Sequence, residues 1–133
     1  MTKPRTILII DDSALTRNAL SEALIARGFT ALTADNGKAG LDLIQKGAPD
    51  VVLMDVVMPV MDGWETCRQI RAAANLQSVP IIIMTHKNTH GDLLRAFEVG
   101  ANEFMEKPID VDELVREIEL LIQRRLDGTA EHR

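Results

Sequence analysis

The stretch VVLMDVVMPVMDG, residues 51–63, carries four apolar residues directly into an aspartate, Asp55. A short run that is apolar throughout and rich in β-branched residues is typical of a strand covered on both faces, as in a parallel sheet. A lone charge inside such a segment would be costly to desolvate. We therefore expect Asp55 to lie where the strand emerges from the core, with another group arriving to neutralise it.

Four more strands and five helices are predicted around this stretch. The runs ILII at 7–10 and IIIM at 81–84 resemble residues 51–54, and weaker runs at 30–34 and 103–105 suit edge strands. Helical patterns lie between them, one of them starting at Asp62-Gly63. In the fourth helix we expect the apolar face to be Leu93, Ala96, Phe97 and Gly100. The last helix has the clearest stripe, with Asp110 ahead of it as N-cap: Val111, Leu114, Ile118, Leu121 and Ile122.

Strands that alternate with helices over the whole chain predict an α/β fold with a parallel sheet and right-handed crossovers. We expect one domain over residues 1–126, a doubly wound (βα)5 sheet, and a short polar tail at 127–133. Sheets of this kind bind ligands beyond the carboxyl ends of their strands, so these ends are where functional residues are expected.

Composition excludes several classes of function. The chain has 133 residues and a net charge of −5, and its one basic cluster, Arg124-Arg125, is too small to track a nucleic-acid backbone. No apolar run is long enough to span a membrane, and the N-terminus lacks the apolar core of a signal peptide. The single cysteine, Cys67, suits a reducing compartment and reads as core packing. We expect a protein of the cytoplasm that binds neither nucleic acid nor membrane.

Polar residues follow the predicted strands: Asp11, Asp12, Asp55, Thr85 and Lys107. If the strand order is 2-1-3-4-5, the three carboxylates converge on one edge of the sheet. Like charges this close raise one another's pKa values, and a hard divalent cation with oxygen ligands, Mg²⁺ above all, would relieve the repulsion. The lysine adds a fixed positive charge and the threonine a hydroxyl donor.

A metal, an ammonium and a hydroxyl around one carboxylate form an arrangement for a phosphoryl group, whose charge must be spread over several partners. Asp55 is the expected nucleophile, because a carboxylate with an ordinary pKa of about 4 is ionised at neutral pH. A serine would need a base, and none is evident at these strand ends. The expected product is a reactive, temporary acyl phosphate.

Four motifs at these spacings resemble the receiver domain of two-component response regulators, including its single-domain chemotaxis members. They are IIDDS at 9–13, MDVVMPVMDG at 54–63, MTH at 84–86 and EKPI at 106–109, within a similarity over about residues 5–125. The resemblance implies the flavodoxin-like fold with strand order 2-1-3-4-5. It also implies that a sensor histidine kinase or a phosphotransfer protein donates a phosphoryl group to Asp55.

The resemblance further implies the roles of individual residues. Mg²⁺ would be held by Asp12, Asp55 and the backbone carbonyl of Val57, with Asp11 acting through a bound water. Lys107 would contact Asp55 and a phosphoryl oxygen, and the Lys107–Pro108 bond would be cis. Thr85 would move to hydrogen-bond the phosphoryl group and Phe104 would rotate inward. A downstream protein would then bind the face of the fourth helix, fifth strand and fifth helix. The chain itself would be a monomer or a weak phosphorylation-dependent dimer.

Three residues set this chain apart from the usual pattern. His86 stands where most receivers have a small residue, and its imidazole would flank the phosphoryl pocket. Val57 and Lys87 would lie beside the acyl phosphate, and neither offers a carboxylate or amide to orient an attacking water. We therefore expect the phosphorylated form to last longer than in receivers with Asn or Glu at these places.

Two other functions stay open from the residues alone. One is a Mg²⁺-dependent phosphatase with an aspartate nucleophile, although such enzymes usually carry D-x-D after the first strand, where this chain has Asp11-Asp12-Ser13. The other is a receiver-like docking module that is never phosphorylated, which the complete set of acids, hydroxyl and lysine disfavours. The leading prediction is a signalling switch and not an enzyme that turns over a small substrate.

Overall fold

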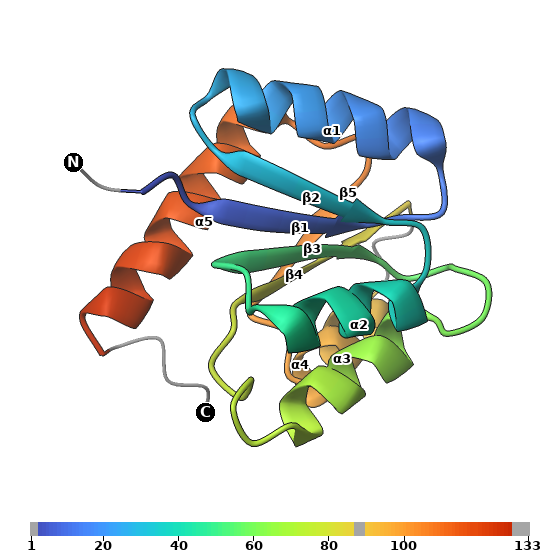
Figure 1. Cartoon of the computed structure of the whole chain (residues 1–133). Helices are drawn as coiled ribbons and strands as arrows, with labels where there is room; N and C mark the ends of the chain where they lie inside the picture. The colour runs from blue at the N-terminus through green and yellow to red at the C-terminus, as the bar shows by residue number, and fades with distance from the viewer. Residues whose placement is uncertain (1–2, 87–89, 129–133) are drawn as a thin grey trace.

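The computed structural model describes residues 3–86 and 90–128 and consists of five strands that alternate with five helices (Figure 1). The elements are β1 (Thr6–Ile10), α1 (Ala14–Ala26), β2 (Thr30–Ala34), α2 (Gly37–Lys46), β3 (Val51–Asp55), α3 (Gly63–Ala72), β4 (Ile81–Thr85), α4 (His90–Glu98), β5 (Glu103–Glu106) and α5 (Val111–Leu126). Every predicted element is present, and four of the five strands are one residue longer than the apolar runs alone indicated.

The sheet is parallel with strand order β2-β1-β3-β4-β5, as predicted. β1, β3 and β4 lie inside the sheet and are buried almost throughout, whereas β2 and β5 lie at its edges and are partly exposed. This burial explains the continuous apolar runs, because a central strand of a doubly wound sheet is covered by helices on both faces.

Two apolar layers cover the sheet. α1 and α5 pack on one face, where Leu24 and Ile118 are fully buried, and α2, α3 and α4 cover the other, where Ile44 and Ile70 are nearly so (Figure 1). Cys67 also lies in this second layer and is fully buried, as its predicted role in packing requires.

The helix starts follow local capping chemistry. Asp110 caps α5 as predicted, and Asp62, at the predicted start of α3, caps that helix. Each accepts a hydrogen bond from the backbone N–H three residues on. The predicted stripe of α5 faces the sheet, with Leu114, Ile118 and Leu121 buried.

The expectation for α4 was wrong in two residues. Ala96 is buried, but Phe97 is 52% exposed, because a helix on the outside of a sheet buries a narrow stripe and leaves the neighbouring position at its margin. Gly100 lies beyond the end of the helix, in a turn with a positive φ of 98°. In the described part of the chain, no helix is both long and apolar enough to cross a membrane.

Candidate functional site

The carboxyl edge of the sheet gathers the polar residues that the sequence singled out. Asp11 and Asp12 follow β1, Asp55 ends β3, Thr85 ends β4, and Lys107 follows β5. Ligand oxygens of the three carboxylates lie within 4.8 Å of one another. Residues far apart in the chain therefore meet because parallel strands end at the same edge.

Asp11 is fully buried and anchored on both carboxylate oxygens. Its Oδ1 accepts a hydrogen bond from the backbone N–H of Ser13 at 2.9 Å, and its Oδ2 accepts one from Lys107 Nζ at 2.6 Å. The backbone is held too, since Arg17 donates to the Asp11 carbonyl at 2.8 Å. A buried carboxylate satisfied in this way is held in a fixed orientation.

Lys107 is the cation shared by two acids. Its Nζ lies 2.6 Å from Asp11 Oδ2 and 3.5 Å from Asp55 Oδ1, and its side chain is only 7% exposed. The predicted contact with Asp55 is confirmed, but the shorter pair with Asp11 was missed. Both acids after β1 were assigned to the metal site, Asp11 through a bound water, and the sequence does not show that Asp11 is buried and Asp12 exposed.

The β3–α3 loop closes tightly beneath Asp55. The Asp55 Oδ1 accepts a hydrogen bond from the Val56 N–H at 2.9 Å, and Gly63 donates its N–H to the Val56 carbonyl at 2.8 Å. A Cβ at Gly63 would lie only 2.4 Å from the Asp55 carbonyl oxygen. Glycine is required there because the loop returns to its own starting point.

The surroundings of Asp55 act on its charge in opposing directions. Burial raises the pKa of the Asp55 carboxyl, the Lys107 ammonium lowers it, and the negative charge of Asp11 raises it again, with a net rise. The Asp55 carboxyl therefore ionises less readily than an ordinary aspartate. A further positive charge at this edge would lower the pKa and favour the anion.

The acidic cluster has a charge balance that fits a divalent cation. Three carboxyl groups face one ammonium, and all three offer hard oxygen ligands. Asp12 is exposed beside the buried Asp11 and Asp55, so the cluster opens to solvent on one side. This set of oxygen donors suits a divalent cation such as Mg²⁺.

Thr85 and the β5 end are tied together by the backbone. Lys107 donates its N–H to the Thr85 carbonyl at 2.7 Å, and Thr85 is 7% exposed. The Lys107–Pro108 bond is cis, as the resemblance implied. Phe104, the predicted switch aromatic, lies opposite Ile83 in the β4–β5 register and is partly buried against the α2–α3–α4 layer.

Two of the three unusual residues lie at the rim of the site. His86 is exposed and lines an apolar hollow together with Lys107. Val57 is 75% exposed on the β3–α3 loop, and Lys87 lies outside the described residues. One feature of the same loop was not anticipated: Val60 has a positive φ of 72°, which is unfavourable for a β-branched residue and has no signal in the sequence pattern.

The comparisons with known proteins agree with this geometry. Residues 7–119 match the model of the response regulator receiver domain. The chain belongs to this family. It is a receiver domain of two-component signalling, in which the domain acts as a phosphoacceptor switch.

Individual relatives support the assignment. The chain is 33% identical over 130 residues to the response regulator MprA of Mycolicibacterium vanbaalenii, covering 96% of this chain and 55% of that protein. It thus spans about half the length of the curated relatives it matches. Its structure resembles chemotaxis protein CheY4 of Vibrio cholerae, with a TM-score of 0.85, 28% identity, and coverage of 90% of this chain and 99% of that one.

A further similar structure contains a metal. The receiver domain of a sensor histidine kinase from Pseudomonas aeruginosa has a TM-score of 0.85 and 28% identity, covering 91% of this chain and 99% of its own. In that protein a magnesium ion is coordinated in the active site cleft. The acidic cluster of this receiver has the composition that such an ion requires.

Proposed function

We propose that Asp55 of this receiver accepts a phosphoryl group, with Mg²⁺ held by Asp12, Asp55 and the Val57 carbonyl and oriented by Asp11. The observation that carries the proposal is the convergence of three carboxylates within 4.8 Å around an acid that Lys107 also contacts at 3.5 Å. A bound Mg²⁺ would supply positive charge to the phosphoryl oxygens and to the Asp55 carboxylate.

The residues of the chain would divide the reaction among them. An Asp55 carboxylate oxygen attacks phosphorus of a phosphohistidine, the P–N bond breaks, and its electron pair stays on the imidazole. Lys107 neutralises charge on a transferred oxygen, and the Thr85 hydroxyl donates a hydrogen bond to another. No base is needed, because the attacking group carries no proton when ionised.

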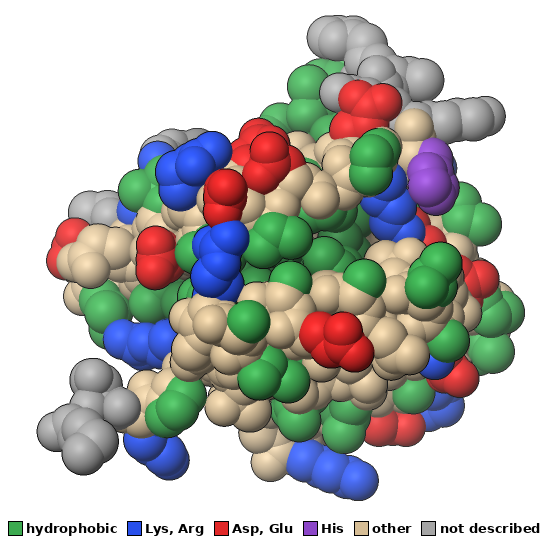
Figure 2. Space-filling view, turned by 90° about the horizontal axis from the view of Figure 1, so that it is seen from above, with side chains coloured by type: hydrophobic (Ala, Val, Ile, Leu, Met, Phe, Trp, Pro, Cys, Tyr) green, Lys and Arg blue, Asp and Glu red, His purple; other side chains and the backbone are tan. Residues whose placement is uncertain are grey.

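The donor would be a histidine kinase or phosphotransfer protein that docks over α1. An apolar hollow of about 310 Å³ lies between α1 and the segment after β5, directly beside Lys107 (Figure 2). Leu15 at its rim is 81% exposed. A helix that seats apolar residues in this hollow would bring a histidine to the acidic edge. The lining residues are Leu15, Thr16, Ala19, Leu20, His86, Lys107, Pro108, Ile109 and Val111.

The partner that reads the signal would bind the face of α4, β5 and α5. Leu94 and Phe97 on α4 are each 52% exposed, which gives this face apolar anchors. Movement of Thr85 and Phe104 on phosphorylation would shift a pre-existing equilibrium of this face. We expect a monomer, or a weak dimer after phosphorylation, that acts in the cytoplasm as one domain over residues 1–126.

Acetyl phosphate tests the acceptor directly. Wild-type protein with acetyl phosphate and Mg²⁺ should gain about 80 Da, the mass of one phosphoryl group. Asp55→Ala should show no gain, while Asp35→Ala, which removes an exposed acid just after β2, should behave as wild type. EDTA should suppress the gain. An unchanged gain in Asp55→Ala, or sustained hydrolysis of p-nitrophenyl phosphate, would contradict the proposal.

The lifetime of the phosphorylated form tests the effect of the unusual residues Val57 and Lys87. We propose that the phosphorylated form persists for minutes or longer, because Val57 and Lys87 offer no group that orients water. Decay of the added mass after removal of acetyl phosphate measures it. Val57→Asn should speed the decay, and Val60→Asn on the same exposed loop should serve as control. Loss of the mass within seconds in the wild type would refute this expectation.

A further inference from the structure

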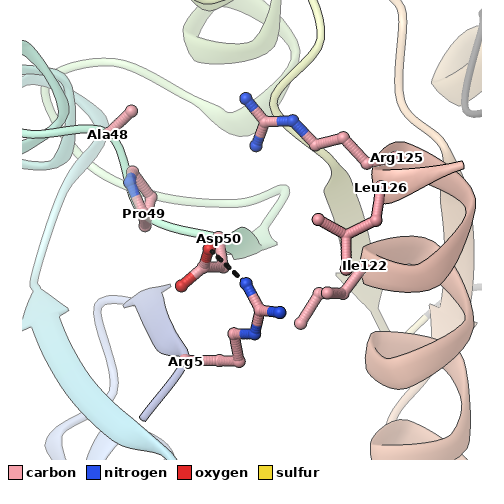
Figure 3. A pocket seen from close by; sticks show the side chains of 7 residues that line it. All are labelled: Arg5, Ala48, Pro49, Asp50, Ile122, Arg125 and Leu126. Carbon is pink, nitrogen blue, oxygen red and sulfur yellow. Dashed lines mark ion pairs between the residues drawn. The ribbon is translucent and has the colours of Figure 1, made fainter. Parts of the chain in front are cut away.

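A second hollow lies at the opposite edge of the sheet, where the strands begin. It has a volume of about 420 Å³ and is lined from three segments that meet there: the residue before β1, the loop before β3, and the last turn of α5 (Figure 3). Its lining residues are Arg5, Ala48, Pro49, Asp50, Ile122, Arg125 and Leu126. None of these residues belongs to the phosphoacceptor site.

The one acid in the hollow is already balanced. Asp50 Oδ1 lies 3.7 Å from an Arg5 guanidinium nitrogen, and Asp50 Oδ2 accepts a hydrogen bond from the Thr6 N–H at 2.7 Å. Figure 3 shows Arg5 reaching this carboxylate from one side of the hollow. Asp50 therefore compensates Arg5 and is fixed by the backbone.

Arg125 enters the hollow from the other side. Its guanidinium points from the end of α5 toward the hollow (Figure 3), and it forms no ion pair with the described residues, 3–86 and 90–128. A partly buried guanidinium that pairs with none of the described acids can bind an anion.

Apolar side chains line part of the hollow, beside its charged residues. Ala48 and Pro49 form one side, and Ile122 and Leu126 form the other (Figure 3). A free inorganic ion would leave these surfaces in contact with water, whereas an anion on a small apolar group would cover them. The shape and charge together favour a ligand with one anionic end and one apolar end.

We infer that this hollow binds a carboxylate or phosphate carried on a small apolar group, with Arg125 as its main anchor and Arg5 as a second donor. The guanidinium plane presents paired N–H donors that match the oxygens of either anion. A ligand held there would connect the last turn of α5 to the starts of β1 and β3. The inference is independent of phosphorylation at Asp55.

Two probes and three variants test it. Phenylacetate and phenyl phosphate are titrated into the full chain without Mg²⁺, and backbone amide shifts are followed by NMR. Saturable shifts at Asp50, Ile122 and Leu126 are expected with at least one probe, and the probe that binds identifies the anion. Arg125→Gln should weaken binding about tenfold or more, as expected for loss of a charge-assisted pair. Asp50→Asn should strengthen it by removing the competing carboxylate.

The matched control is Arg116→Gln, since Arg116 is exposed elsewhere on α5 and its loss changes the net charge equally. This variant should bind as wild type. Equal affinity in Arg125→Gln and wild type, equal weakening in Arg116→Gln, or no saturable shift up to about 10 mM, would overturn the inference. So would shifts confined to Thr85 and Lys107, which report the other edge.

Discussion

At the carboxyl edge of the sheet, buried charges face one another: Asp11 and Asp55 lie with Lys107 in one hydrogen-bonded group. At the amino edge, Arg71 is instead held by neutral groups. Its guanidinium donates to the carbonyls of Gly100, Leu76 and Val79 and to the Asn102 side chain, at 2.7 to 3.2 Å. Among the described residues, the ion pairs of the carboxyl edge are buried, whereas the Arg5–Asp50 pair at the amino edge is partly exposed.

The difference indicates what each edge does. Opposed charges respond strongly when a cation or a phosphoryl group arrives, because each new charge changes the balance. A guanidinium bound to carbonyls is insensitive to such changes and serves to fix loops in place. The carboxyl edge is suited to switching and the amino edge to holding the strand starts still.

The largest effect should come from removing the cation of the carboxyl edge. Lys107→Met leaves Asp11 and Asp55 buried without a positive partner and should lower the free energy of unfolding by about 3 kcal/mol. Urea denaturation measures it. Lys38→Met, which breaks only an exposed pair with Asp42, should cost less than about 0.5 kcal/mol.

Mg²⁺ sharpens this test. If the acidic cluster binds the ion, Mg²⁺ should raise the melting temperature of Lys107→Met more than that of the wild type, because the variant has more uncompensated negative charge. An equal loss of stability in the Lys107 and Lys38 variants would show that the buried pair is not what distinguishes this edge.

The amino edge should be nearly as sensitive to the loss of Arg71. Arg71→Met leaves the carbonyls of Gly100 and Val79 without their donor and should lower the free energy of unfolding by about 2 to 3 kcal/mol. Unlike the Lys107 variant, its stability should not respond to Mg²⁺.

The control for this loss lies on the same helix. Arg68→Met removes an exposed guanidinium that pairs only with Glu65 among described residues, and it should change stability by less than about 0.5 kcal/mol. Equal costs for the two variants would mean that the carbonyl contacts contribute little.

The contrast between the edges also shows what sequence reasoning can and cannot predict. The apolar runs fixed the strand positions, and parallel strands bring their carboxyl ends together, so Asp55 and Lys107 could be predicted to meet. The role of Arg71 could not, because its partners are backbone carbonyls, which every residue possesses and no motif marks. The pairing of Lys107 with Asp11 needed side-chain distances of a few ångströms.

A smaller effect should come from backbone conformation. At the amino edge, the positive-φ turns after α1 and α4 are made by Gly28 and Gly100, whereas at the carboxyl edge Val60 takes a φ of 72°. Val60→Gly should therefore raise the free energy of unfolding by about 1 kcal/mol. Val57→Gly in the same loop is the control and should not stabilise, since Val57 has no positive φ. A destabilised Val60 variant would contradict this account.

The smallest effect concerns Glu103, a partly buried acid at the amino edge with another acid beside it. Burial raises the pKa of Glu103 at the start of β5, and the nearby Glu117 raises it further. A raised pKa means that the folded state binds the proton more tightly than the unfolded state. Ionised Glu103 therefore lowers the free energy of unfolding at pH values above its folded pKa, and this loss is absent at pH values below its unfolded pKa. Glu103→Gln should therefore raise the melting temperature at pH 7 to 8, and the gain should vanish near pH 4.

Glu119→Gln, at an exposed position on α5, should show no such pH-dependent gain. If Glu103→Gln stabilised equally at both pH values, packing and not charge would be the cause, and the two edges would differ less in electrostatics than their contacts indicate.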